Sequence, residues 1–369
     1  MQIEGVTVHA LFCKGGIWLH KTLEKQTVKE RNYAVDLIKI TAFCLVVTVH
    51  FFLHTDYYNT PLIGVKMFFL TNIRNLAMTC VPLFIIATGY LMSEKKWSKR
   101  YYWGAVRTVV TLVITEIICC LYDSRVFADK PFWKQIFQMG TSHYSWYIDM
   151  YVGLFLIIPF LNLAYKNLDS QKEKQRLVIS FAAITMLIPS VFSLFKLEQG
   201  WWDIAYPLGY YYIGCYLKEY GIKIKGVYCA LTAIASAVIM SSAHFAVCYN
   251  HTMLQSLCIT NYNSVFVAVM SVAIFSLILK TNDALKNKSF LNKAVSRLSG
   301  LTLGAYLISY VIDDIVYDIA YYYYDVDGHK LTAFPIIVIT VIFCSLCLSY
   351  FINLFVDGIM YFVNKFKKA

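Results

Sequence analysis

Long apolar segments that alternate with short polar segments are the dominant pattern along this chain. A helix needs about 20 consecutive apolar residues to cross the hydrocarbon core of a bilayer, and most of the apolar segments are close to this length. The pattern therefore predicts an all-α membrane protein with about ten transmembrane helices. We expect these helices at residues 34–54, 67–92, 102–122, 145–165, 177–195, 204–218, 226–247, 262–280, 300–322 and 333–363.

The composition agrees with a multi-pass protein of the cell (plasma) membrane. Of the 369 residues, 59% are hydrophobic and 15% are charged, whereas soluble domains average about 45–50% apolar and about 25% charged residues. Residues 32–364 are expected to form one transmembrane domain, with cytoplasmic tails at 1–31 and 365–369. The first tail has no apolar core followed by a cleavage site, so we do not interpret it as a signal peptide.

The net charge of +11 comes from Lys and Arg residues that gather in alternate loops. In membrane proteins, the loops rich in Lys and Arg lie on the cytoplasmic side. The distribution therefore predicts that both termini are cytoplasmic (N-in and C-in). It also argues against nucleic acid as a partner, because the positive charge is spread over these loops.

The first apolar segment carries ionisable residues where a membrane span normally has none. Asp36, Lys39 and His50 lie within RNYAVDLIKITAFCLVVTVHFF, residues 31–52. A charge at membrane depth costs at least a few kcal/mol, so such residues usually face a protein interior and have a function there. The spacing from Lys39 to His50 places both on one helix face, about 16 Å apart, with Asp36 one turn before Lys39.

Several segments in a fixed order carry a resemblance to a known family. The first is the basic residue Lys39, ten residues and then His50, with Asp36 three positions before the lysine. The second is CVPLFIIATGYLM at 80–92, which is followed by Arg100 and Arg107. Further matches are at 143–162, 206–217 and 298–309. Together they resemble the acyltransferase 3 family of bacterial membrane proteins, which usually have ten helices.

Two positions depart from the family pattern. The basic residue of the first helix is more often Arg, and Lys39 keeps the charge without the bidentate fork of a guanidinium. The ninth span often carries a His where this chain has Ser309. A mechanism that needs a second His at that position is therefore not expected here.

The resemblance implies a membrane O-acyltransferase. Such an enzyme moves an acyl group, commonly acetyl from cytoplasmic acetyl-CoA, onto a hydroxyl of a cell-envelope glycan or related acceptor. The expected partners are thus acyl-CoA, a glycan and the lipid bilayer, and no metal is expected. We hypothesise that the CoA phosphates lie near the cytoplasmic residues Lys39, Arg100 and Arg107, while the thioester reaches outward to His50.

His50 is the expected catalytic residue, supported by Asp36 and Lys39. Imidazole changes its protonation near neutral pH, so His50 could act as a general base or as the nucleophile that carries the acyl group. Sequence leaves both roles open. The carboxylates that could orient its ring are Glu116, Asp149, Asp313 and Asp314.

Other interpretations remain open at the level of sequence. Asp36 and Lys39 could be a structural pair at the membrane boundary, and Arg100 and Arg107 could serve only to set the topology. The alternative function is a transporter or flippase of a small polar molecule or saccharide. Aromatic residues expected near the outer helix ends are candidate sugar platforms: Trp146, Tyr147, Trp201 and Trp202.

Overall fold

The protein is all-α, as the sequence predicts. The computed structural model describes residues 31–126, 131–137, 144–192, 200–248, 258–323 and 329–366. These ranges contain helices and no β-strand. Most of the predicted N-terminal tail and the last three residues lie outside them, so the tail assignments stay predictions.

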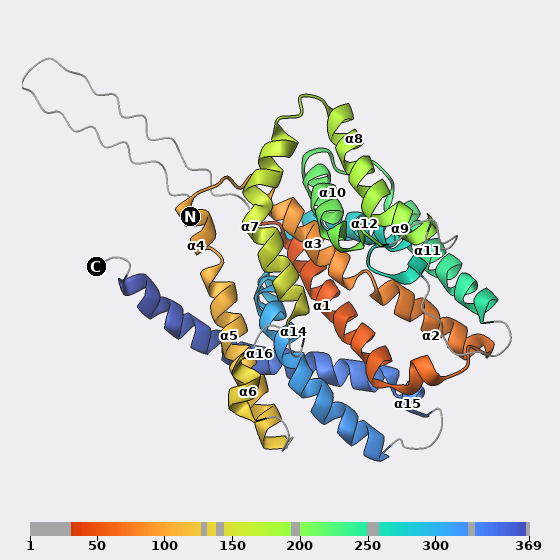
Figure 1. Ribbon diagram of the computed structural model, residues 1–369, viewed down its shortest axis with the longest axis vertical. Coiled ribbons are helices and arrows are strands. Elements are labelled where there is room, and N and C mark those ends of the chain that lie inside the picture. The colour runs from red at the N-terminus through yellow and green to blue at the C-terminus, as the bar shows by residue number, and fades with distance from the viewer. Residues whose placement is uncertain are drawn as a thin grey trace, which may run out of the picture. The chain divides into compact units, whose positions relative to one another are not determined.

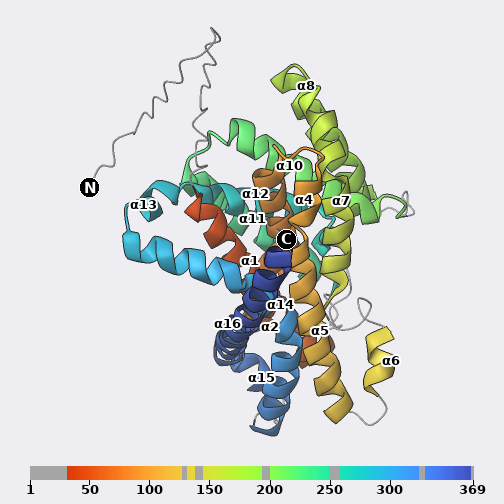
Figure 2. The same cartoon turned by 90° about the vertical axis from the view of Figure 1, so that its left-hand side faces the viewer.

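The helices have the following bounds, and Figures 1 and 2 show their arrangement. In chain order they are α1 (Tyr33–His54), α2 (Gly64–Ala77), α3 (Cys80–Met92), α4 (Lys99–Trp103), α5 (Val106–Val126), α6 (Phe132–Phe137), α7 (Trp146–Lys166), α8 (Gln171–Ala182), α9 (Ile188–Val191), α10 (Tyr206–Tyr220), α11 (Gly226–Val247), α12 (Val265–Leu279), α13 (Asn282–Lys286), α14 (Ser289–Tyr323), α15 (His329–Thr332) and α16 (Phe334–Phe366).

Nine stretches of the described chain are long and apolar enough to cross a membrane, which makes this a multi-pass membrane protein. The central one is α1, which contacts α2, α3, α12, α14 and α16 (Figure 1). Helix α5 runs beside α14 and α16 (Figure 2). A helix surrounded in this way is shielded from lipid, so it is the natural place for ionisable side chains.

The helix expected at 67–92 is divided into α2 and α3. The break lies at Met78 and Thr79, and Pro82 follows within the first turn of α3. A proline ring clashes with the carbonyl group four residues earlier, here that of Met78, and it has no N–H to donate. Hydropathy does not show this break because both halves are apolar.

Helices α1 and α14 run parallel and in register. Near one end the Ser299 hydroxyl donates to Asp36 Oδ1 at 2.8 Å, and near the other His50 Nδ1 lies 3.1 Å from Asp313 Oδ2. Both pairs are separated by 263 residues in the chain, so the register is constant over two heptads, about 21 Å.

The parallel pair bears on the expected count of ten helices. Six of the nine candidate stretches lie between α1 and α14. An even number of intervening crossings would make α1 and α14 antiparallel, so their parallel packing requires an odd number, which one further crossing would supply. Helix α10 has only 15 residues, about 22 Å, but it is the remaining predicted segment. The count of ten therefore requires α10 to cross, and the N-in orientation stays a prediction.

Helices α3 and α10 are in direct backbone contact. A Cβ atom at Gly89 would overlap the carbonyl oxygen of Tyr211, and a Cβ atom at Gly214 would overlap that of Ile86. Backbone atoms cannot move aside as a flexible side chain can, so any larger residue would force the helices apart. The two glycines therefore fix α3, which contributes residues to the site described below.

We expect Gly89→Ala and Gly214→Ala to destabilise the protein by at least about 1–3 kcal/mol, because an overpacked contact must open. Thermal unfolding of the detergent-solubilised protein would show a midpoint several degrees lower. Gly153→Ala in α7 is the control, since a Cβ atom there meets nothing within 4 Å. Equal midpoints for all three variants would contradict this account of the contact.

Candidate active site

A cavity of about 320 Å³ lies between α1, α3, α7 and α14. Lys39 and His50 both line it, so the two residues that share a face of α1 also share one cavity. Its walls are mainly apolar and aromatic. The aromatic lining residues are Phe84, Trp146, Tyr147, Tyr151, Tyr262 and Tyr306.

His50 is buried and paired with a carboxylate. Its Nδ1 lies 3.1 Å from Oδ2 of Asp313, whose side chain is completely buried. An ionised carboxylate can only accept, so Nδ1 carries the hydrogen, and in the neutral imidazole Nε2 keeps its lone pair. No described residue forms a hydrogen bond with Nε2. His50 is therefore arranged as a base, or a nucleophile, at the cavity wall.

Asp313 is the one among the four candidate carboxylates that contacts the imidazole in the described chain. Asp149 is exposed, and Asp314 instead accepts a hydrogen bond of 2.7 Å from the Tyr122 hydroxyl. Ser309 lies one turn before Asp313 and donates to the carbonyl oxygen of Tyr306. The polar group that faces His50 from α14 is thus a carboxylate, four residues beyond the position where the family often has His.

Asp36 and Lys39 lie at the other end of the same face of α1. The Lys39 ammonium is 4.0 Å from Asp36 Oδ1, and that oxygen also accepts the hydrogen bond from Ser299. Lys39 lines the cavity, whereas Asp36 does not. This geometry makes Asp36 a residue that positions Lys39. They lie about three to four helical turns from His50, so neither touches its reactive nitrogen.

A second cavity of about 420 Å³ adjoins the first and is rich in basic residues. Met92, Thr108 and Tyr151 line both cavities. The charged residues of the second cavity are Glu94, Lys95, Lys96 and Arg100. It lies at the Lys39 end of the first cavity, because α3 ends there at Met92. Arg100 is therefore placed where the sequence predicts an anion-binding residue.

The turn that carries these lysines is held by a buried side chain of α7. Asn162 donates through Nδ2 to the carbonyl oxygens of Met92 and Lys95, at 2.8 and 2.7 Å. The Tyr211 hydroxyl donates in turn to Asn162 Oδ1 at 2.6 Å. Three helices, α3, α7 and α10, thus fix the position of the turn.

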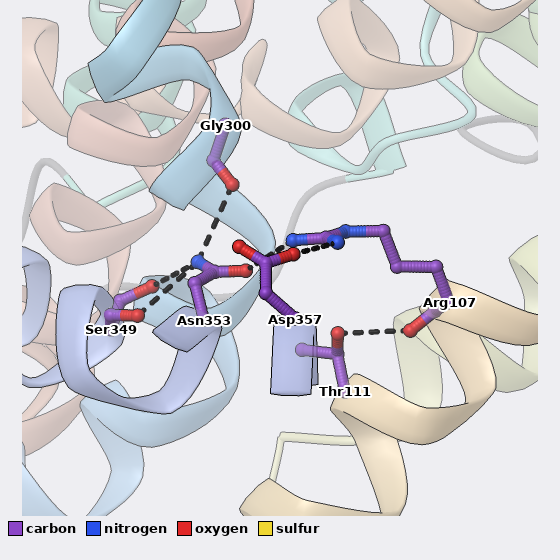
Figure 3. Close-up of polar contacts among 6 residues, drawn as sticks. All are labelled: Arg107, Thr111, Gly300, Ser349, Asn353 and Asp357. Atoms are coloured by element: carbon purple, nitrogen blue, oxygen red, sulfur yellow. Dashed lines mark hydrogen bonds and ion pairs between the residues drawn. The ribbon is translucent and has the colours of Figure 1, made fainter. Parts of the chain in front are cut away.

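Arg107 does not belong to either cavity. Its guanidinium pairs with Asp357 and donates to Asn353 Oδ1 at 3.2 Å, and both partners are on α16 (Figure 3). Asn353 Nδ2 also donates to the carbonyl oxygen of Ser349 at 3.2 Å. The structure therefore places Arg107 in the seam between α5 and α16, away from the expected donor phosphates.

The aromatic residues singled out from the sequence separate into two pairs. Trp146 and Tyr147 line the first cavity, and the Trp146 ring stacks on Tyr262 with centroids 5.9 Å apart. Trp201 and Trp202 are 79% and 57% exposed and line neither cavity. Only the first pair is placed to contact a molecule that approaches His50.

Sequence analysis missed three residues of this region. Lys95 and Lys96 line the second cavity, and Tyr144 contacts both His50 and Asp313. The lysines directly follow the matched segment at 80–92, which is the signal that could have identified them. Tyr144 lies inside the matched segment at 143–162, but a single tyrosine among many carries no distinguishing pattern.

One comparison with known proteins finds a match. A family model described as an acyltransferase domain matches residues 32–354, nearly the whole chain. Comparison with curated proteins and with solved structures found no match. The match covers the two cavities and both members of the His50–Asp313 pair. The chain therefore belongs to the acyltransferase 3 family, and the protein is an acyltransferase.

Proposed function

We propose that the protein transfers an acetyl group from cytoplasmic acetyl-CoA to a hydroxyl of a cell-envelope glycan or related acceptor. The observation that carries this proposal is the path formed by two adjoining cavities, a basic one and one lined by Lys39 and by His50, whose Nε2 has no hydrogen-bond partner in the described chain. The path suits a donor that has an anionic head and a long arm ending in the reactive group. Acyl-CoA is such a molecule.

The basic cavity would hold the phosphates of the donor. Arg100, Lys95 and Lys96 line it, and Lys39 lines the adjoining first cavity. Cationic side chains bind phosphates through charge-assisted hydrogen bonds. Lys39 and His50 are about 16 Å apart along α1, a distance that an extended pantetheine arm can cover.

His50 would act as a general base at the end of the path. Its Nε2 takes the proton of the acceptor hydroxyl while the oxygen attacks the thioester carbon, and the carbon–sulfur bond then breaks. The proton returns from His50 to the departing thiolate. Asp313 holds the imidazole in the required tautomer and stabilises the positive charge that forms on it, as the carboxylate of a catalytic triad does.

The lining of the first cavity favours a neutral or anionic acceptor. Lys39 is its charged residue, and its lining includes no Asp or Glu from the described chain. Aromatic rings such as Trp146 and Tyr147 offer apolar faces for a sugar ring together with polar groups for its hydroxyls. A glycan hydroxyl fits these walls better than an amine does.

Replacing His50 by Gln is expected to lower acetyl transfer by a factor of about 10²–10⁴, because the amide cannot accept the proton. The purified protein would be incubated with radiolabelled acetyl-CoA and an envelope glycan fraction. His244→Gln is the matched control, because His244 is buried in α11 and lines neither cavity. Wild-type activity in folded His50→Gln would reject the catalytic assignment. Label that stays on the wild-type protein without acceptor would instead identify an acyl-histidine.

Asp313→Asn should reduce kcat by about 10²–10⁴-fold while the KM for acetyl-CoA stays the same, because the change affects the histidine and not donor binding. Asp314→Asn is the control. It alters the adjacent carboxylate, which accepts from Tyr122. Steady-state kinetics of the three proteins checks this. Equal losses in both variants would show that Asp313 has no special relation to His50.

Arg100→Ala should raise the KM for acetyl-CoA about tenfold, because one charge-assisted contact is lost. If Arg100 binds the 3′-phosphate, the variant should no longer distinguish acetyl-CoA from its 3′-dephospho analogue. Lys223→Ala, an exposed change in the turn between α10 and α11, controls for general charge effects. An unchanged KM for Arg100→Ala would exclude it from the donor site.

A further inference from the structure

Tyr144 connects Asp313 to a second histidine. Its hydroxyl lies 2.8 Å from Asp313 Oδ2 and 2.7 Å from Nε2 of His54, the last residue of α1. The centroids of the Tyr144 and His50 rings are 3.9 Å apart. One tyrosine therefore contacts the carboxylate and both histidines.

The direction of the hydrogen bonds in this chain follows from the donors available. Tyr144 has one hydroxyl hydrogen, and an ionised carboxylate can only accept, so the hydroxyl donates to Asp313. The Tyr144 oxygen must then accept from His54, which requires hydrogen on Nε2 of His54. The chain runs from His54 through Tyr144 to Asp313.

The contacts of Asp313 are one-sided. Its Oδ2 accepts from His50 Nδ1 and from Tyr144, whereas its Oδ1 is buried and has no hydrogen-bond partner in the described chain. No hydrogen bond from the described residues at Oδ1 opposes rotation of the carboxylate. Its orientation therefore depends on the two donors at Oδ2, and Tyr144 is the one that does not take part in proton transfer.

Tyr144 is itself held firmly. The Tyr306 hydroxyl donates to its backbone carbonyl oxygen, and the Tyr310 ring packs edge-on against its ring at 5.6 Å. His54 is held by its stack on Tyr317, at 4.8 Å, and by the Tyr321 hydroxyl, which donates to its carbonyl oxygen. The side chains that support the chain thus come from α14, the helix that carries Asp313.

We propose that Tyr144, held by His54, is a positioning residue that keeps Asp313 Oδ2 against His50 Nδ1. This inference rests on the proposed role of His50 as a base. By donating to Asp313, Tyr144 also takes up part of the negative charge that would otherwise act on His50. It therefore sets both the geometry of His50 and how strongly His50 holds a proton.

Other titratable groups lie around the hydrogen bonds that link His54, Tyr144 and Asp313, and they also influence the pH dependence of His50. From α5, Tyr122 donates to Asp314, and Asp123 accepts from Tyr310. From α14, Tyr306 and Tyr317 flank Tyr144 and His54, and from α3, Cys80 lines the same cavity as His50. All of these groups stay the same in the variants below.

Tyr144→Phe keeps the ring and removes the hydroxyl. We expect kcat to fall about 10–100-fold with an unchanged KM for acetyl-CoA. We also expect the acid limb of the kcat–pH profile to move to higher pH, because Asp313 then favours the protonated form of His50 more strongly. A purely structural defect would lower kcat by the same factor at every pH and would leave the position of the acid limb unchanged. Tyr57→Phe is the control, since it also removes one buried hydrogen bond, to Thr71, outside both cavities.

His54→Gln and His54→Leu give an independent pair of variants. Glutamine can still donate to the Tyr144 oxygen and should retain most of the activity, whereas leucine should reproduce the effect of Tyr144→Phe. The inference is overturned if Tyr144→Phe has the wild-type kcat and pH profile, or if the two His54 variants behave alike. Loss of transfer in His50→Gln, combined with normal Tyr144→Phe, would leave the proposed function standing and reject this inference alone.

A spectroscopic measurement tests the hydrogen bonds from His54 through Tyr144 to Asp313 without relying on activity. In protein labelled with ¹⁵N-histidine, the ring nitrogen shifts report which nitrogen carries hydrogen, and His54→Gln identifies the His54 signals. We expect hydrogen on Nε2 of His54 in the wild type and a changed pattern in Tyr144→Phe. Hydrogen on Nδ1 alone, or identical His54 signals in both proteins, would overturn the inference even if the acyl donor were different from the one proposed.

Discussion

The register between α1 and α14 is the constraint on which the rest of the structure depends. Two polar pairs fix it, Asp36 with Ser299 and His50 with Asp313. A slip of one turn would break both pairs and leave buried polar groups unsatisfied, which costs several kcal/mol for each group in an apolar medium. One member of each pair, Ser299 and His50, lines the first cavity, so the contacts that align the helices also align the site.

The sequence predicts most of the helices and the site residues that share one helix. Both follow from helical periodicity, which depends only on residues close together in the chain. The spacing of Lys39 and His50 was enough to place them on one face, and they line one cavity. It could not choose Asp313 among four carboxylates, because that choice depends on the register of two helices far apart in the chain. A signal for Asp313 did exist, because the polar residues of α14 repeat with the same heptad spacing as Asp36, Lys39 and His50 on α1. These residues of α14 are Ser299, Thr302, Tyr306, Ser309 and Asp313.

At other positions a distant partner, which the sequence does not reveal, determines where a side chain lies. The guanidinium of Arg107 contacts Asp357 and Asn353 on α16 and lines neither cavity (Figure 3). Its contact with a phosphate stays a prediction. Trp201 and Trp202 are residue types that often contact sugar rings, but both are exposed and line neither cavity. Pro82 was a sequence signal for the break within 67–92. A count of apolar residues does not distinguish proline from residues that continue a helix.

The hydrogen bonds that Asn162 makes to the turn after α3 have a consequence for binding affinity. A turn that becomes ordered only when its ligand arrives loses conformational entropy at that moment, and affinity falls accordingly. Here the backbone at Met92 and Lys95 is tied to Asn162 by two hydrogen bonds within the protein itself. The entropic cost of ordering this turn is therefore met during folding, and the proposed donor phosphates would meet a preorganised surface.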